Sequence, residues 1–190
     1  MKTSTIILAA GQGTRMVSDL AKVLHPLNGK PLVLYSIEIA EKLGSEHLVV
    51  VVGNEAEKVR QVVGERAQFA LQEKRLGTAH AVRAAEKMLS GFNGLVVVIS
   101  ADMPLLTSAT VRRLVDAQVA NKGPLSLRTV HSRNAGGFGR SLRDGQGNVT
   151  AIIEEAQATP DQLKIDELNV GVYCFESSWL WTALKQVRLS

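Results

Sequence analysis

Residues 5–16 read Thr5-Ile6-Ile7-Leu8-Ala9-Ala10-Gly11-Gln12-Gly13-Thr14-Arg15-Met16, an apolar run that passes directly into a glycine-rich loop. The apolar part predicts a buried strand over residues 5–9. Glycines placed after a strand allow a tight turn and let several backbone N–H groups point at one anion. The stretch therefore predicts a phosphate-binding loop, although an ordinary strand–turn–helix corner with an exposed Arg15 would have the same pattern.

This loop differs from two common nucleotide-binding motifs. Met16 stands where a dinucleotide-binding fingerprint has its third glycine, and no Gly-Lys-Ser/Thr follows as it does in a Walker A loop. The chain instead offers two cations, Arg15 inside the loop and Lys22 just beyond it.

Strands and helices alternate after the loop. A β-branched run without alternation predicts a strand covered on both faces over residues 49–52, and strands are also predicted over 68–71 and 95–100, the last being the most apolar. Helices are predicted from Lys30-Pro31 to Gly44, over 55–63, over 77–89, and from an N-cap at Thr107 to about residue 120. Beyond this point the pattern changes to strands joined by turns, over 125–130, 139–143, 149–154 and 170–175, with a hairpin turn at 144–148 and a helix from 177. We expect an α/β fold with a mostly parallel central sheet flanked by helices, and a mixed β region at one edge.

The composition excludes several classes of protein. The chain has 190 residues, of which 45% are hydrophobic and 21% charged, as in ordinary globular domains. A net charge of +4 and an aromatic content of 4% argue against nucleic-acid binding, and the longest apolar runs are too short to cross a membrane. The single cysteine, Cys174, excludes an internal disulfide and favours the reducing cytoplasm.

Two more segments are candidates for the site. Asp102 follows the most apolar predicted strand, where open α/β sheets bind ligands, and its carboxylate could hold Mg²⁺; an aspartate ahead of Pro104 could equally be a turn residue. Gln72 ends another strand and offers both a donor and an acceptor to a pyrimidine edge. Gly77-Thr78 could approach the same base or only start a helix.

Other catalytic patterns are lacking in the sequence. The four histidines, His25, His47, His80 and His131, have no metal-ligand spacing, so we assign them no catalytic role. No G-x-S-x-G elbow occurs either, which argues against a hydrolase.

A series of short motifs in one order is much more specific than any single motif. The series consists of residues 8–16, 18–25, 29–31, 71–72, 76–81, 102–106, 137–140, 153–154 and 168–171. It closely resembles the N-terminal uridyltransferase domain of the bifunctional N-acetylglucosamine-1-phosphate uridyltransferase and glucosamine-1-phosphate acetyltransferase family. The resemblance covers nearly the whole chain and implies a Rossmann-like nucleotidyltransferase fold.

The resemblance also implies roles for individual residues. The residues implied to bind the nucleotide are Leu8, Ala10, Gly11, Gly13, Gln72, Gly77 and Thr78. Arg15 and Lys22 would hold the triphosphate as the catalytic cations, and Asp102 would bind Mg²⁺. The residues implied to bind the sugar are Gly139, Glu154 and Asn169.

The reaction implied is transfer of a uridylyl group from UTP to N-acetylglucosamine 1-phosphate, giving UDP-N-acetylglucosamine and pyrophosphate. A related transferase using dTTP, CTP or glucose 1-phosphate, and a nucleotide-binding module without turnover, are the alternatives. We expect no nucleic-acid or membrane partner, and the oligomeric state is left open.

The resemblance finally implies an expectation about the extent of the domain. In the family, the uridyltransferase domain continues past the point that corresponds to Ser190, where it supplies a second magnesium ligand, and an acetyltransferase β-helix follows. Residues 1–190 are therefore expected to be a truncated uridyltransferase domain that binds UTP but turns over poorly.

Overall fold

The chain folds into two compact units. The computed structural model describes residues 1–11, 13, 16, 18, 20–53, 55–74 and 76–187. The first unit comprises Met1–Ser126 and Tyr173–Ser190, and the second comprises Leu127–Val172.

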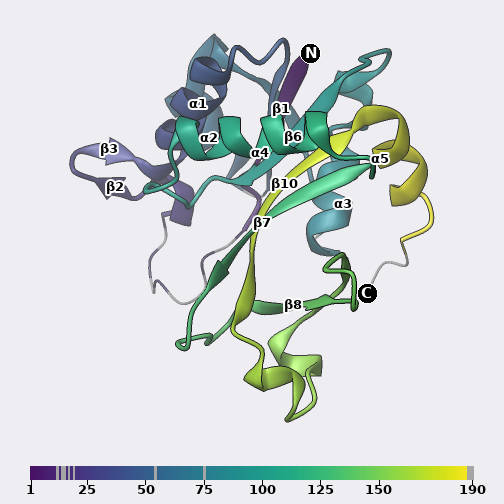
Figure 1. The fold of residues 1–190 in the computed structure, drawn as a ribbon. Helices are drawn as coiled ribbons and strands as arrows, with labels where there is room; N and C mark the ends of the chain where they lie inside the picture. Colours follow the sequence, from purple (N-terminus) through teal and green to yellow (C-terminus); the bar gives the residue numbers. More distant parts are fainter. Residues whose placement is uncertain are drawn as a thin grey trace. The chain divides into compact units, whose positions relative to one another are not determined.

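The first unit is built on a mostly parallel sheet. Four parallel strands lie in the order β5-β4-β1-β6, and the later part of β10 joins β6 in the antiparallel sense. Their bounds are Gln68–Leu71 for β5, Leu48–Val52 for β4, Thr3–Leu8 for β1, Leu95–Ser100 for β6 and Glu167–Glu176 for β10. This arrangement confirms the predicted α/β fold with a mostly parallel sheet, of which Figure 1 labels β1, β6 and β10.

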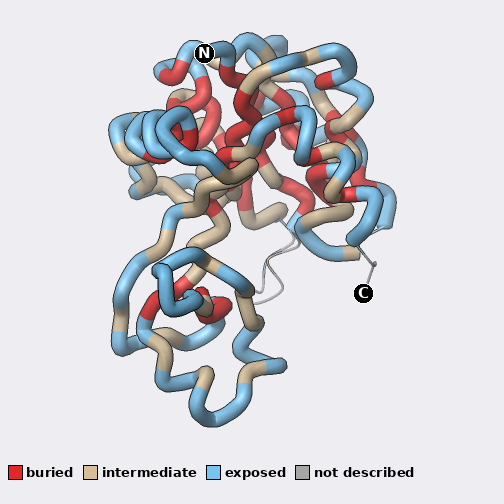
Figure 2. Tube along the Cα trace, turned by 45° about the vertical axis from the view of Figure 1, so that its right-hand side comes forward, coloured by how far each residue is buried: buried red, intermediate tan, exposed pale blue. Residues whose placement is uncertain are grey.

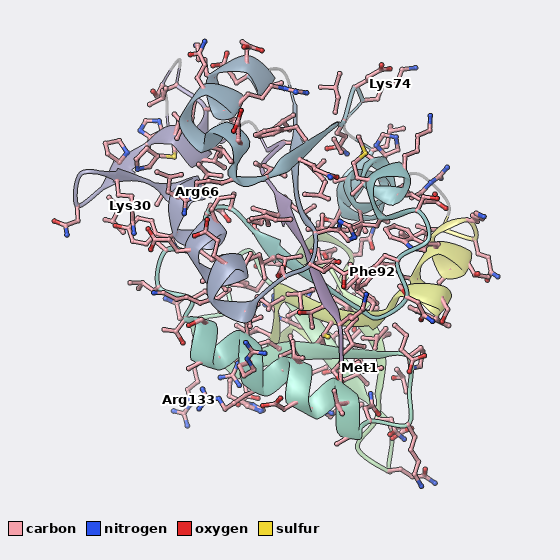
Figure 3. The ribbon with its side chains drawn as sticks, turned by 90° about the horizontal axis from the view of Figure 1, so that it is seen from above. Met1, Lys30, Arg66, Lys74, Phe92 and Arg133 are labelled. Carbon is pink, nitrogen blue, oxygen red and sulfur yellow. The ribbon has the colours of Figure 1, made fainter. Side chains whose placement is uncertain are left out.

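Helices cover both faces of this sheet. The helices are α1 (Leu32–Leu43), α2 (Ala56–Val63), α3 (Gly77–Ala84), α4 (Ser108–Ala120) and α5 (Ser177–Leu184). Figure 3 shows α1 and α4 on one side of the strands and α3 and α5 on the other. Within the described part of the chain, no helix combines the length and the apolar character that crossing a membrane requires.

The core of this unit explains its uninterrupted apolar strands. The side chains of Val49–Val52 and Val96–Ile99 are fully buried. Figure 2 shows the buried residues gathered in the interior of this unit. Alternate residues pack against opposite helical layers, so neither face of a strand needs polar residues. Cys174 lies in β10 with no exposed surface, and burial raises the pKa of its thiol to about 12.

Two details differ from the sequence prediction. The helix predicted over residues 77–89 is interrupted at Ala85, where α3 gives way to a 3₁₀ turn over Glu86–Leu89. Pro31 precedes α1 instead of being its first residue, because Lys30-Pro31 forms strand β3 and pairs with β2 (Pro26–Leu27). Asn28 and Gly29 both have positive φ in the tight turn of this unpredicted hairpin, as Asn-Gly hairpin turns require.

The second unit is antiparallel. It contains most of β7 (Leu125–His131), then β8 (Gly139–Arg143), β9 (Val149–Ile153) and the early part of β10. Strand β8 pairs with both β9 and β10, and β7 also pairs with β10. The predicted hairpin turn between β8 and β9 is confirmed: Asp144 Oδ1 accepts hydrogen bonds from the backbone N–H of Gln146 and of Asn148, at 2.9 and 2.8 Å.

A buried carboxylate stabilises this second unit. Both oxygens of Glu167 accept hydrogen bonds from Arg143, at 2.7 and 2.6 Å, and Thr129 Oγ1 donates to Oε1 at 2.7 Å. The hydrogen bonds from Arg143 lower the pKa of Glu167 to about 2, outweighing the opposing effect of burial, and Thr129 adds to the shift. Glu167 is therefore ionised throughout the physiological range.

This pKa predicts how stability depends on pH. A carboxylate with a depressed pKa in the folded state stabilises the protein above its unfolded pKa, near 4.5, and this stabilisation is lost as the pH falls towards 2. Glu167→Gln should reduce the free energy of unfolding at pH 7 and flatten the loss of stability between these two pH values. Chemical denaturation at stepped pH measures both effects, with Glu57→Gln on α2 as the matched control. Parallel pH profiles for the Glu167 variant and the wild type would contradict the assignment.

Candidate active site

The carboxyl ends of the parallel strands meet at one edge of the first unit's sheet. Backbone hydrogen bonds continue past the strands: Ala9 N donates to Val51 O at 2.8 Å, and Gln72 N donates to Val52 O at 2.8 Å. Ala101 N donates to Leu8 O at 3.0 Å. The glycine loop, Gln72 and the segment that leads to Asp102 therefore start side by side, as ligand-binding segments of open α/β sheets do.

The glycine loop begins at this edge. Leu8 is the last residue of β1, Ala10 is buried, and Gly11 is exposed. A Cβ atom on Gly53, which follows β4, would lie 3.0 Å from the carbonyl oxygen of Ala10, so the two loops approach closely. Arg15, the first predicted catalytic cation, lies outside the described residues, and its role stays a prediction.

Gly13 makes room for Lys22. Its φ of +63° lies in the left-handed region, and a Cβ atom there would come within 2.6 Å of Lys22 Cβ. Lys22 is the first residue of a 3₁₀ turn over Lys22–Leu24, and its side chain passes directly over the glycine. The sequence suggested a phosphate-binding role for the loop glycines, but it did not reveal that Gly13 positions a cation.

Lys22 and Asp102 form an ion pair that joins two of the predicted site segments. Lys22 Nζ lies 2.6 Å from Asp102 Oδ2, and both side chains remain partly exposed. Burial acts to raise the pKa of Asp102, but hydrogen bonds from Lys22 and Ser100, together with the charge of Lys22, lower it below its usual value. Asp102 is therefore an anion at neutral pH. The ammonium group of Lys22 could leave this carboxylate and pair with a substrate phosphate instead.

The donor set at Asp102 fits a magnesium ion. The described residues contain no cluster of three or more His, Cys, Asp or Glu side chains that could enclose a metal by themselves. Mg²⁺ does not need one, because it usually takes one or two carboxylates and completes its shell with waters and substrate phosphates. An ionised, partly exposed carboxylate at the edge of the sheet meets that requirement.

The base-reading candidates are gathered at the start of α3. Gln72 is buried, and its Nε2 donates to Gly77 O at 3.2 Å. Gln72 Nε2 also lies 3.1 Å from His80 Nδ1. Thr78 follows Gly77 and is exposed. His80 was not predicted to take part; the available signal was its spacing of three residues from Gly77, which places both on one face of a helix.

The sugar-binding candidates all lie in the second unit, where three strands bring them together. Asn169 on β10 stands opposite Gly139 on β8, and a Cβ atom on Gly139 would lie 3.5 Å from Glu154 Oε1. The sequence did not reveal that two neighbouring side chains, Glu155 and Arg140, hydrogen-bond the backbone just before Gly139. Glu155 Oε2 accepts a hydrogen bond from Gly137 N, and the buried Arg140 donates to Phe138 O. The three predicted residues thus form one patch, and Gly139 lacks a side chain where Glu154 approaches.

Comparison with known proteins identifies the family. The family model of the MobA-like NTP transferase domain matches residues 5–152. The chain belongs to this family. The matched range contains the glycine loop, Lys22, Gln72 and Asp102.

Curated relatives agree with this assignment. The bifunctional protein GlmU of Shouchella clausii (strain KSM-K16) is 43% identical over 183 residues, which are 96% of this chain and 40% of the relative. GlmU of Pediococcus pentosaceus is 43% identical over 99% of this chain and 40% of its own length, and GlmU of Geotalea daltonii is 37% identical over 98% and 41%. The resemblance to a bifunctional family is confirmed, and the chain spans about 40% of the length of these relatives.

The geometry of Gly13 leads to a prediction. Gly13→Ala should displace Lys22, because the new Cβ would meet Lys22 Cβ at 2.6 Å and the backbone would be strained at a φ of +63°. We expect nucleoside triphosphate affinity to fall by roughly tenfold or more, the factor that the loss of one hydrogen bond from a charged group represents. Calorimetric titration measures this. Gly123→Ala is the control, since its Cβ would make only ordinary contacts at 3.5 Å or more. Unchanged affinity in Gly13→Ala would show that the position of Lys22 is unimportant.

Proposed function

We propose that this chain transfers a uridylyl group from UTP to N-acetylglucosamine 1-phosphate, releasing pyrophosphate and forming UDP-N-acetylglucosamine. We assign both units to one nucleotidyltransferase domain. The proposal concerns this reaction alone, because the chain spans about 40% of the length of its curated relatives. The single cysteine, which excludes an internal disulfide, favours the cytoplasm as the compartment.

The observation that carries the proposal is the convergence of distant motifs. The loop after β1, Gln72 after β5 and Asp102 after β6 start at one edge of one sheet, held by backbone hydrogen bonds of 2.8–3.0 Å. They are also the motifs that resemble the uridyltransferase domain. A nucleotide site needs a base-reading amide, phosphate-binding cations and a metal-binding carboxylate in one place, and these residue types are the ones that converge.

Each residue then has a role suited to its chemistry. Leu8, Ala10, Gly11, Gly13, Gln72, Gly77 and Thr78 contact the nucleoside and the start of the phosphate chain. Lys22 leaves its ion pair with Asp102 and binds the phosphates instead. Arg15 adds a second cation, whose planar guanidinium group offers several N–H donors. Gly139, Glu154 and Asn169, adjacent in the second unit, bind the sugar.

The reaction requires neutralisation of negative charge on the phosphates, and it requires no general base. The sugar phosphate is already ionised near neutral pH. One of its oxygens forms a bond to the α-phosphorus of UTP, the bond between that phosphorus and the bridging oxygen breaks, and pyrophosphate leaves with the electron pair. Two anions must meet in line, so Lys22 and Arg15 act by neutralising and positioning them.

Asp102 would hold the magnesium ion that this chemistry calls for. When bound, Mg²⁺ supplies positive charge to the phosphate oxygens and fixes their orientation. The ion pair with Lys22 involves Oδ2 of Asp102, and the pKa of the carboxyl lies below its usual value, so the group is ionised at neutral pH.

A pyrophosphate-release assay tests the function directly. With Mg²⁺, UTP and N-acetylglucosamine 1-phosphate, we expect release that requires all three components, and mass spectrometry should detect UDP-N-acetylglucosamine. Faster release with dTTP, CTP or glucose 1-phosphate would transfer the proposal to a related reaction. UTP binding without release at any magnesium concentration would show a binding module instead.

The metal-binding role of Asp102 has its own test. Asp102→Asn removes the charge but keeps the shape, so turnover should fall by about a hundredfold and half-maximal rate should need more Mg²⁺. The thermal unfolding temperature should stay near that of the wild type, because the side chain is partly exposed. Asp116→Asn on the exposed face of α4 makes the same chemical change and should leave turnover unaltered. A large loss of stability with an unchanged magnesium response would identify Asp102 as a turn residue only.

A further inference from the structure

We propose that His80 is a positioning residue that fixes the side-chain amide of Gln72, so that the site selects a pyrimidine carrying an N3–H group. This inference rests on the proposed uridylyl transfer and adds to it the physical basis of base choice.

The orientation of the Gln72 amide follows from its partners. The atom of Gln72 that lies 3.2 Å from the carbonyl oxygen of Gly77 must be the NH₂ group, because a carbonyl oxygen can only accept. Gly77 is the first residue of α3 and has a φ of +87°, a conformation that glycine adopts readily. In this conformation its carbonyl oxygen accepts from Gln72 Nε2. The amide nitrogen is therefore held on the side of the helix.

The tautomer of His80 follows from its contact with Gln72. Gln72 Nε2 is the donor in the 3.1 Å contact with His80 Nδ1, so Nδ1 accepts and carries no proton. The ring must then be the neutral tautomer with its proton on Nε2. Both hydrogens of the Gln72 NH₂ group now have acceptors, one on Gly77 and one on His80.

What remains of the amide is an acceptor. The NH₂ group and Oε1 lie on opposite sides of the planar amide. Because the NH₂ group faces Gly77 and His80, Oε1 points away from both residues. Among the described residues, none donates a hydrogen bond to Oε1 in the structure. Gln72 lies at the carboxyl ends of the parallel strands, where the glycine loop also starts. A base bound at this edge of the sheet would therefore meet the hydrogen-bond acceptor Oε1.

An acceptor at this point separates uracil from cytosine. Uracil carries a donor at N3, whereas cytosine has an acceptor at N3 and an amino group at C4. An amide free to rotate by 180° would offer NH₂ to cytosine N3 equally well. Gly77 and His80 together oppose this rotation: a rotated amide would place Oε1 against Gly77 O, which can only accept, and would lose the hydrogen bond from Nε2 to His80 Nδ1. The selected class is a nucleoside triphosphate with an imide N–H, which includes UTP and dTTP.

Two substitutions of His80 separate the positioning role from a structural one. Asn places its Oδ1, an acceptor, at the branch position that Nδ1 occupies in histidine, whereas Leu places a methyl group there. Leucine is also the better helix former, so an effect on the stability of α3 would favour Leu over Asn. A positioning effect has the opposite order, because only Asn can accept from Gln72.

The experiment measures UTP and CTP affinity of the full chain by calorimetry in the presence of Mg²⁺. The wild type should prefer UTP. His80→Leu should bind UTP roughly three- to tenfold more weakly, the factor that one net hydrogen bond represents, and should bind CTP no worse, so that the UTP:CTP preference falls. His80→Asn should recover most of the preference. Thermal unfolding of all three proteins shows whether each is folded.

The contrary outcomes are also distinct. If folded His80→Leu keeps the wild-type preference, or if His80→Asn behaves as His80→Leu does, the positioning role is wrong. Equal binding of UTP and CTP by the wild type, or binding of neither, would also overturn it. The pyrophosphate-release assay decides the proposed function separately, because a chain that turns over UTP without any preference over CTP would retain the function and lose this inference.

Discussion

Backbone hydrogen bonds that run past the ends of parallel strands hold the nucleotide side of the site together. Leu8 O, Val51 O and Val52 O accept from the N–H groups of Ala101, Ala9 and Gln72, at 2.8–3.0 Å. These groups lie next to strands β1, β4 and β6, whose central side chains are buried, and an unpaired donor or acceptor in a buried place costs about 1–3 kcal/mol. The loops cannot separate without exposing such groups, so a rigid core fixes residues that lie far apart in the sequence.

Within this frame, charge and base recognition are organised independently. The Lys22–Asp102 pair belongs to the loops after β1 and β6, and each residue serves as the counter-ion of the other. Gln72 follows β5 and His80 lies on α3, on the β5 side of the parallel strands, and neither carries a formal charge when His80 is the neutral tautomer. A nucleotide can therefore be chosen for its base by one group of residues and activated through its phosphates by another.

Much of this arrangement was predictable from the sequence, and the exceptions have physical causes. Strands β5 and β6 agree with prediction at both ends, because their apolar runs are bounded by polar or glycine residues. The contact between Lys22 and Asp102 was not predictable, since no local pattern reports which distant side chains meet. The partner of Gln72 was also missed, although His80 is only eight residues away, because the tautomer and hydrogen bond depend on how α3 packs against β1 and β4. The predicted roles of Arg15 and of the sugar-binding residues remain predictions.

The burial of Cys174 makes the protein convenient for spectroscopy. Thiol-reactive dyes attack the thiolate, and the only thiol in this chain is fully buried with a pKa raised to about 12. A cysteine introduced on the surface would consequently be the only group labelled in the folded protein, with no need to remove the natural one. Two introduced cysteines, one on α4 and one on the β8–β9 turn, labelled with a mixture of donor and acceptor dyes, would report the distance between the two units in solution as UTP is added.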